Sequence, residues 1–181
     1  MTNAGAVASL CRRLPLDSLN NANRLYALVD GARYLTLDKR LADAAGSIQF
    51  QWLLAGSELD EISHAGPALV EFSSMHASAN GFLDWLIARD KQSPLVSWLW
   101  SGHPFTVMAE HHRCLLFTQM PDGRRSLFRY YNPQVRRALE QVVTPGQRQQ
   151  LMRHVSQWQI WQPLQSGYLS YEGQDVEAGD V

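Results

Sequence analysis

One short apolar run organises the hydrophobic pattern of this chain. Residues 95–100 read Leu-Val-Ser-Trp-Leu-Trp, so only Ser97 interrupts the run, and Pro94 and Gly102 bound it. A short apolar run with such flanks is typical of a strand that is buried on both faces. The pattern therefore predicts a strand at the centre of a sheet, with helices covering both sides.

Helical periodicity lies on either side of this strand. Phe82, Leu83, Leu86 and Ile87 recur at the spacing of one helix face within 79–89. A second helix is expected over 104–112, because proline suits a first helical turn and Pro104 stands there. These two helices are expected to pack on the sheet.

Further apolar stretches predict the remaining elements. Strands are expected at 25–29, 50–54, 68–72 and 158–161, the last alternating like an edge strand. A helix is expected over 32–45, which Asp30 could cap, and a short helix is expected over 7–14. The fold class that follows is α/β in the mixed α+β sense, with a central mixed sheet flanked by helices.

The region 114–131 carries a hairpin signal. Pro121-Asp122-Gly123 fits a type I turn between arms at 114–120 and 125–131. Asn132 and Pro133 then suit the cap and first position of a helix. A second helix begins at a capping box formed by Thr144 and Gln147. We therefore expect a hairpin followed by a helical pair towards the C-terminal end of the domain.

The first of these two helices is expected to bury one stripe of apolar residues and to expose its opposite face to solvent. The stripe comprises Val135, Ala138, Leu139 and Val142. Arg136 and Glu140 are four residues apart and are expected to pair on the wet face.

Length and charge divide the chain into three parts. Its 181 residues suit one domain, which we place at 24–162, after an N-terminal segment at 1–23. Residues 163–181 lose the hydrophobic pattern and end in an acidic stretch, so they are expected to be a disordered tail. Neither a signal peptide nor a membrane span is recognisable, which predicts a cytoplasmic protein in which Cys11 and Cys114 are free thiols.

Catalytic fingerprints are missing from the sequence, and the histidines near Cys114 offer only weak chemistry. His103, His111 and Cys114 could hold a metal ion, and Cys114 with His111 or His112 could form a nucleophile and its base. The competing interpretation, which we favour, is a helix end carrying histidines and a buried core cysteine. No metal and no cofactor is therefore expected.

Positive charge is concentrated in residues 124–153. This stretch contains seven arginines, and its only acidic residue is Glu140. An acidic protein and a nucleic acid are the two kinds of partner that such a surface could bind. Arg129 stands out because Phe128 and Tyr130 flank it in an expected strand, where a charge must be paired, stacked or at an interface.

Three segments in this order resemble a known family. They read Leu25-Tyr26-Ala27-Leu28-Val29-Asp30-Gly31-Ala32-Arg33, Ser93-Pro94-Leu95-Val96-Ser97-Trp98-Leu99-Trp100-Ser101 and Leu127-Phe128-Arg129-Tyr130-Tyr131-Asn132-Pro133-Gln134-Val135-Arg136. They are similar to the effector adaptors of bacterial type VI secretion systems, called Tap or TEC, whose domain was long catalogued as of unknown function. The resemblance covers about residues 25–161. The family often has Asp at the position of Asn132, and both residues cap helices.

The resemblance implies a cytoplasmic adaptor or chaperone and not an enzyme. Its implied partners are a toxic effector, bound near the effector's N-terminus, and the VgrG spike protein, with neither nucleic acid nor a membrane. Two rival hypotheses stay open: a small enzyme or metal-binding protein using His103, His111 and Cys114, and a basic nucleic-acid-binding domain.

For the adaptor we expect a polar cluster of Arg129, Tyr131 and Asn132 where the hairpin meets the following helix. The nearby Arg136 and Arg137 are candidates for contact with the partner. The residues expected in the structural core are Trp98, Trp100, Phe128 and Leu139.

Overall fold

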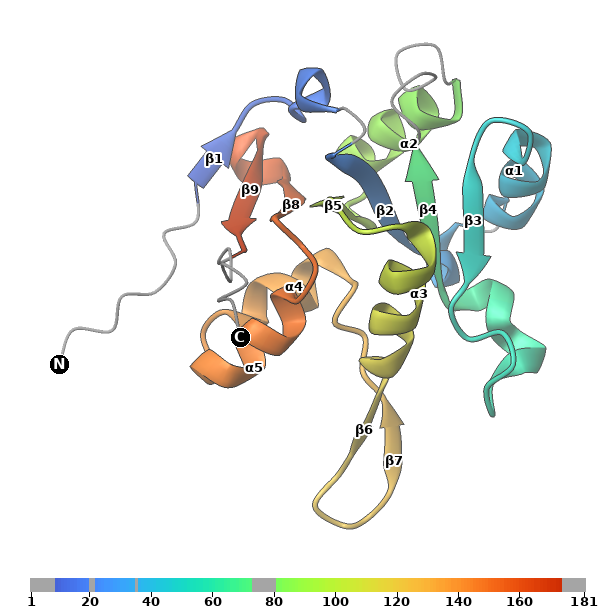
Figure 1. Cartoon of the computed structure of the whole chain (residues 1–181), viewed down its shortest axis with the longest axis vertical. Coiled ribbons are helices and arrows are strands. Elements are labelled where there is room, and N and C mark those ends of the chain that lie inside the picture. The colour runs from blue at the N-terminus through green and yellow to red at the C-terminus, as the bar shows by residue number, and fades with distance from the viewer. Residues whose placement is uncertain (1–8, 20–21, 35, 73–80, 174–181) are drawn as a thin grey trace, which may run out of the picture.

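The computed structural model describes residues 9–19, 22–34, 36–72 and 81–173. These residues form a seven-stranded sheet with helices on both faces, which is the mixed α+β class that was predicted (Figure 1). The strands lie in the order β1 (Ser9–Cys11), β9 (Gly167–Glu172), β8 (Gln157–Gln162), β5 (Val96–Ser101), β2 (Arg24–Asp30), β4 (Pro67–Phe72) and β3 (Gln49–Trp52).

Strand β5 occupies the middle of this sheet, as the apolar run predicted. All six of its residues are buried, and its neighbours are β2 and β8. Trp98 lies opposite Ala27 on one side and Gln159 on the other. Alternate residues of β5 face opposite sides: Trp98 belongs to one apolar cluster and Leu99 to the other.

The two faces of the sheet carry separate apolar layers. Helices α1 (Leu37–Ala44) and α2 (Gly81–Gln92) supply residues to the cluster around Trp98. Helices α3 (Phe105–Cys114) and α5 (Pro145–Met152) supply the cluster around Leu99. Short 3-10 turns complete the elements: η1 (Leu16–Ser18), η2 (Gly31–Arg33), η3 (Asp60–Ala65) and η5 (Pro163–Gln165).

The hairpin projects from the body as a separate two-stranded sheet (Figure 1). Its strands, β6 (Phe117–Gln119) and β7 (Arg125–Leu127), are shorter than the sequence suggested. Gly123 closes the turn with φ of 82°. The second arm does not extend to Tyr131, because Tyr130 and Tyr131 are both buried in one core, which a strand with alternating sides would not allow. Helix α4 (Pro133–Leu139) follows.

Several expectations about the sheet were wrong. Its strands all pair antiparallel, so it is not a mixed sheet. Strand β8 is internal because β9 pairs with it, and β9 lies within the stretch expected to be a disordered tail. That strand carries Tyr168 to one apolar cluster and Tyr171 to the other, which explains why it is ordered.

The N-terminal segment also differs from the prediction. In place of a helix over 7–14, Ser9–Cys11 pairs with β9 as an edge strand. The helix expected over 32–45 is divided into η2 and α1. Within the described ranges, no helix is long and apolar enough to cross a membrane.

Candidate functional site

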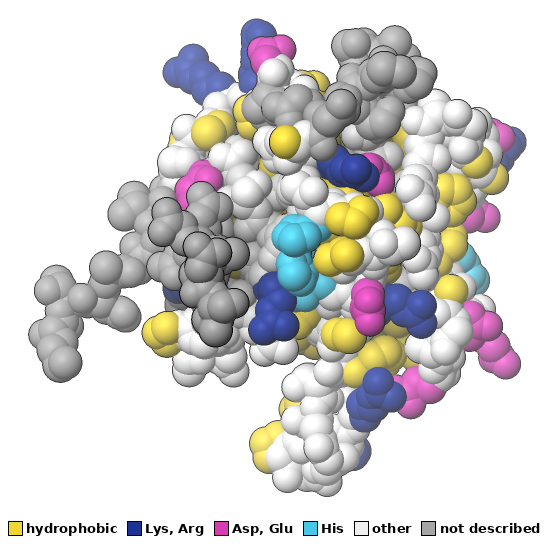
Figure 2. Space-filling view, in the orientation of Figure 1, with side chains coloured by type: hydrophobic (Ala, Val, Ile, Leu, Met, Phe, Trp, Pro, Cys, Tyr) yellow, Lys and Arg dark blue, Asp and Glu magenta, His cyan; other side chains and the backbone are white. Residues whose placement is uncertain are grey.

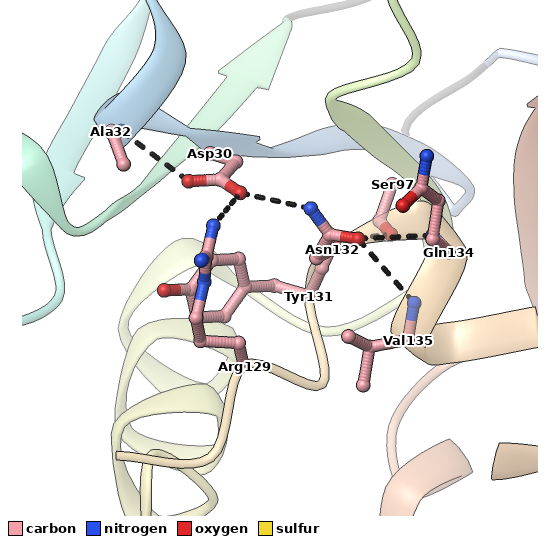
Figure 3. A network of polar contacts seen from close by, with 8 residues as sticks. All are labelled: Asp30, Ala32, Ser97, Arg129, Tyr131, Asn132, Gln134 and Val135. Atoms are coloured by element: carbon pink, nitrogen blue, oxygen red, sulfur yellow. Dashed lines mark hydrogen bonds and ion pairs between the residues drawn. The ribbon is translucent and has the colours of Figure 1, made fainter. Parts of the chain in front are cut away.

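The polar cluster predicted near the hairpin forms around a residue that the prediction did not include. Asp30 ends β2, and its side chain is met by Arg129 and Asn132 from the segment between β7 and α4 (Figure 3). Tyr131 lies in the same segment, close to Asp30 and Arg129. Three of the five predicted partner-binding residues are therefore brought together.

Both oxygens of the Asp30 carboxylate accept hydrogen bonds. Oδ2 accepts from Arg129 Nη2 at 2.5 Å and from Asn132 Nδ2 at 3.0 Å, and Oδ1 accepts from the Ala32 backbone N–H at 3.3 Å. The Asp30 side chain is completely buried, whereas 44% of the Arg129 side chain is exposed. A buried carboxylate needs such partners, since an unpaired buried charge is strongly unfavourable.

Asn132 links this carboxylate to helix α4. Its Oδ1 accepts hydrogen bonds from the backbone N–H groups of Gln134 and Val135, at 3.0 and 3.3 Å, which makes it the helix cap that was predicted. Next to it, the Ser97 hydroxyl donates to the Tyr131 carbonyl at 2.8 Å. The segment between hairpin and helix is thus fastened to both β2 and β5.

The charges in the cluster fix its protonation. Burial alone would lower the pKa of Arg129, but its hydrogen bond to Asp30 and the charge of that carboxylate raise the pKa overall. Burial, reinforced by the negative charge of Asp30, raises the pKa of Tyr131 to about 12. The cluster therefore presents a cationic guanidinium with one part bound to Asp30 and the rest accessible to a partner's hydrogen-bond acceptors.

Arg136 does not lie at the surface where it was expected. Its side chain is 0% exposed and pairs with Glu140, and its guanidinium lies over the rings of Tyr171 and Trp158, at 3.9 and 4.9 Å from their centroids. Met152 accepts a further contact from Nη2 at 3.6 Å. Arg136 is therefore part of the core and cannot contact a partner without rearrangement.

The apolar stripe predicted for α4 was wrong for the same reason. Val142, expected to be buried, is 74% exposed, and Ala138 is exposed as well. Leu139 is only partly buried, as is Phe128, whereas Trp98 and Trp100 are fully buried. The helix turns Arg136 inwards because two aromatic rings and Glu140 provide a site for its guanidinium.

Arg137 is the remaining predicted contact residue, and it is exposed. Its Nη1 donates a hydrogen bond to Gln162 Oε1 at 3.1 Å. Among the five predicted residues, the side chains accessible to a partner are therefore those of Arg129 and Arg137.

The basic stretch is largely neutralised by its own Glu140 and by three acidic residues outside it. Five of its seven arginines form ion pairs, and the pairs are Arg124–Asp122, Arg125–Glu58, Arg129–Asp30, Arg136–Glu140 and Arg148–Glu140. A count over the sequence alone overestimates the positive charge that this region presents to a partner.

Three histidines, His103, His111 and His154, lie close together, and Figure 2 shows histidine side chains gathered on one face of the molecule. His154 Nδ1 lies 3.3 Å from His103 Nε2, and the rings of His111 and His154 are 5.5 Å apart. Burial lowers the pKa of His111 to about 4, with a further contribution from His154. The described part of the chain contains no group of three or more His, Cys, Asp or Glu side chains placed to hold a metal ion.

Cys114 was expected in the core, but it is exposed at the end of α3. Leu116, two residues later, occupies the buried position instead. Cys11 is partly buried, and both cysteines are free thiols.

Asp30 is the residue of this site that sequence reasoning missed. Its position was interpreted only as a helix cap, and it does accept a hydrogen bond from Ala32 at the start of η2. A signal was present, because Asp30 is the one charge at the end of an apolar strand and Arg129 needed a partner. Sequence spacing alone does not reveal a pair whose members are 99 positions apart.

Comparison with known protein families gives one match. Residues 25–150 match the family described as a domain of unknown function, DUF4123. The match includes β2, β5, the hairpin and α4, and therefore every residue of the cluster around Asp30. No curated protein and no solved structure matches the chain.

Proposed function

The chain belongs to the DUF4123 family, and from this membership we propose that it is an adaptor and chaperone of a bacterial type VI secretion system. It acts in the cytoplasm, binds one toxic effector near the effector's N-terminus, and helps to load that effector onto the VgrG spike. It works by binding other proteins and catalyses no reaction.

The family match carries this proposal. DUF4123 is associated with effector adaptors of type VI secretion systems, and the match extends over residues 25–150. The three segments that resemble the adaptors contribute to the cluster: Asp30 comes from the first, Ser97 from the second, and Arg129 and Asn132 from the third. The resemblance therefore involves residues that contact one another in space.

The exposed groups at this site suit a protein partner. Arg129 keeps part of its guanidinium accessible while Asp30 fixes its position, and Arg137 is exposed on the neighbouring helix. Arginine is enriched in protein interfaces because its planar group donates several hydrogen bonds and stacks well. Holding such a side chain in place before binding reduces the entropy lost on association.

Co-expression with the product of the adjacent gene tests the proposal. Size-exclusion chromatography of the purified material is expected to give one peak that contains both proteins in equal amounts. An effector encoded in an unrelated cluster serves as the control and is expected to elute separately. The proposal fails if the chain elutes separately from every effector and spike component encoded beside it. It also fails if the purified chain turns over a small molecule.

A further inference from the structure

Strand β3 forms one end of the seven-stranded sheet. It pairs with β4 on one side, and none of the described residues pairs with its other side (Figure 1). A strand in this position presents unpaired backbone groups along its outer edge, and such groups can pair with another polypeptide.

The register shows which backbone groups point outwards. Leu53 N–H donates to Pro67 O at 2.9 Å, and these two residues continue the register in which Gln51 lies opposite Leu69 and Gln49 opposite Glu71. In an antiparallel pair the hydrogen-bonded positions alternate, so Gln49 and Gln51 bond to β4 and Phe50 and Trp52 point away from it.

Most of these outward groups have no partner among the described residues. The carbonyl of Trp52 accepts from Ala55 N–H at 3.2 Å. The N–H and carbonyl of Phe50 and the N–H of Trp52 are engaged by none of the described backbone or side-chain groups. These three groups lie in one row and could bond to an added strand.

This edge is short, but it lacks several other features that usually prevent strand addition. Natural edge strands are often protected by lysine, proline or a bulge. The four residues of β3 read Gln-Phe-Gln-Trp, with no charge and no proline. The Trp52 ring packs closely against Gly31, where an added Cβ would lie 2.9 Å from it. The edge therefore presents three unpaired backbone groups in the extended conformation that a partner strand requires.

We infer that the outer edge of β3 receives an extended segment of the effector, which adds to the sheet as an eighth strand. The inference rests on the proposed function and names the kind of segment that is bound. Phe50 and Trp52 project to one face and Gln49 and Gln51 to the other, so the segment should alternate apolar and polar residues. A second copy of this chain fits less well, because a dimer formed through these four residues alone would bury far less than the ~1,000 Å² that a stable interface needs, whereas the effector is also proposed to contact Arg129 and Arg137.

Amide hydrogen exchange in the complex with the effector encoded beside this chain tests the inference directly. We expect exchange at the Phe50 and Trp52 amides to slow at least tenfold when the effector binds. Gln51 is the internal control, since its amide already bonds to β4 and should change little. A complex in which the Phe50 and Trp52 amides exchange as fast as in the free chain overturns the inference. Protection that instead appears in the chain alone as its concentration rises also overturns it, because a second copy then occupies the edge.

A pair of variants at one position gives a second test. Phe50→Ala removes the ring but keeps the outward N–H, whereas Phe50→Pro removes both without removing a bond to β4. We expect Phe50→Pro to bind the effector at least tenfold more weakly than Phe50→Ala, and equal affinities of the two folded variants overturn the inference. If Phe50→Pro does not fold, the exchange measurement decides. Failure to form any complex rejects the proposed function itself, whereas a complex with an open edge rejects only this inference.

Discussion

Asp30 and Arg129 are separated by 99 positions in the sequence, yet 2.5 Å separates Oδ2 of the first from Nη2 of the second. The two side chains differ greatly in exposure, since Asp30 is completely buried and Arg129 is half-exposed. Their pair fixes the segment that leads from the hairpin into α4 against the end of β2. Because of this difference in exposure, removing one partner should destabilise the fold more than removing the other.

Removing the Arg129 side chain should therefore lower the free energy of unfolding more than removing the negative charge of Asp30. Arg129→Ala leaves a buried carboxylate with only Asn132 and Ala32 as donors, and we expect the free energy of unfolding to fall by about 3 kcal/mol. Asp30→Asn leaves a half-exposed guanidinium that water can solvate, and the expected loss is about 1–2 kcal/mol. Urea denaturation of both variants measures the difference.

The double variant Asp30→Asn/Arg129→Ala is the control for this comparison. It should be more stable than Arg129→Ala alone, because the buried charge is then absent. If Asp30→Asn is the more damaging single change, the carboxylate is not the group whose burial makes the pair necessary.

Local patterns predicted much of this fold, and long-range pairing accounts for what they missed. The run at Leu95 to Trp100 indicated the central strand, and Asn132 was recognised as a cap, because both features act through neighbouring residues. The burial of Arg136 depends on Tyr171, which is 35 positions further along the chain, a separation that helical periodicity does not register. Strand β9 was missed because it pairs with β8 and β1 and packs Tyr168 and Tyr171 into the two apolar clusters, and these contacts are not visible in its local sequence pattern.

The candidate site was likewise predictable where local pattern decides it and not where a distant residue does. Arg129 was identified because a charge between aromatic residues needs a partner, but its partner Asp30 lies in a strand from the opposite end of the domain. Arg136 and Arg137 are adjacent and chemically alike, so the sequence could not tell which of the two is buried. The structure separates them into a core residue and an accessible one.

The same substitution should accordingly lower the free energy of unfolding far more at Arg136 than at Arg137. Arg136→Ala removes the contacts with Tyr171 and Trp158 and leaves Glu140 with Arg148 alone, so we expect a loss of about 3 kcal/mol in the free energy of unfolding. Arg137→Ala, one residue away on the exposed face, should change it by less than about 0.5 kcal/mol. Equal losses in urea denaturation would contradict the inward orientation of Arg136.

Effector binding should depend on the exposed arginine of this pair. Arg137→Glu reverses an exposed charge on α4, the helix that Asn132 caps, without disturbing the core, and it is expected to weaken binding about tenfold through repulsion and a lost hydrogen-bond donor. The matched control is Arg89→Glu in α2, which belongs to the layer on the other face of the sheet. Isothermal titration calorimetry with the effector encoded next to this chain compares them. Equal affinities for the two variants would remove Arg137 from the interface.

Asp90 is a second buried carboxylate, and replacing it should also lower the free energy of unfolding. Its Oδ1 accepts from the backbone N–H groups of Leu95 and Val96, at 3.0 and 3.1 Å, and its Oδ2 accepts from Trp98 Nε1 at 3.0 Å. Asp90→Asn replaces one acceptor by an NH₂ group that faces an existing donor, so a loss of about 2 kcal/mol in the free energy of unfolding is expected.

Thermal unfolding of Asp90→Asn and Trp98→Phe tests whether these hydrogen bonds hold the start of β5 in place. The tryptophan variant loses one of the three donors and also leaves a cavity, because phenylalanine is smaller than the fully buried Trp98 side chain, so its melting temperature should fall as well. A wild-type melting temperature for Asp90→Asn would mean that the start of β5 is held by other contacts.

Acid should destabilise the protein through the histidine cluster. Burial, with a contribution from His154, lowers the pKa of His111 from 6.5 to about 4, so the unfolded chain binds a proton there more readily than the folded chain. Stability from this group is complete above pH 6.5 and is lost as the pH falls to about 4, which amounts to about 1–2 kcal/mol because solvent screens the partly exposed ring. His111→Gln removes the titrating group and keeps a donor for the Leu151 carbonyl, so its unfolding free energy should fall less over this range than that of the wild type.

His64→Gln, at an exposed position in η3, is the control and should follow the wild type. Parallel curves for the wild type and His111→Gln would show that the folded protein accommodates a charged His111 without cost.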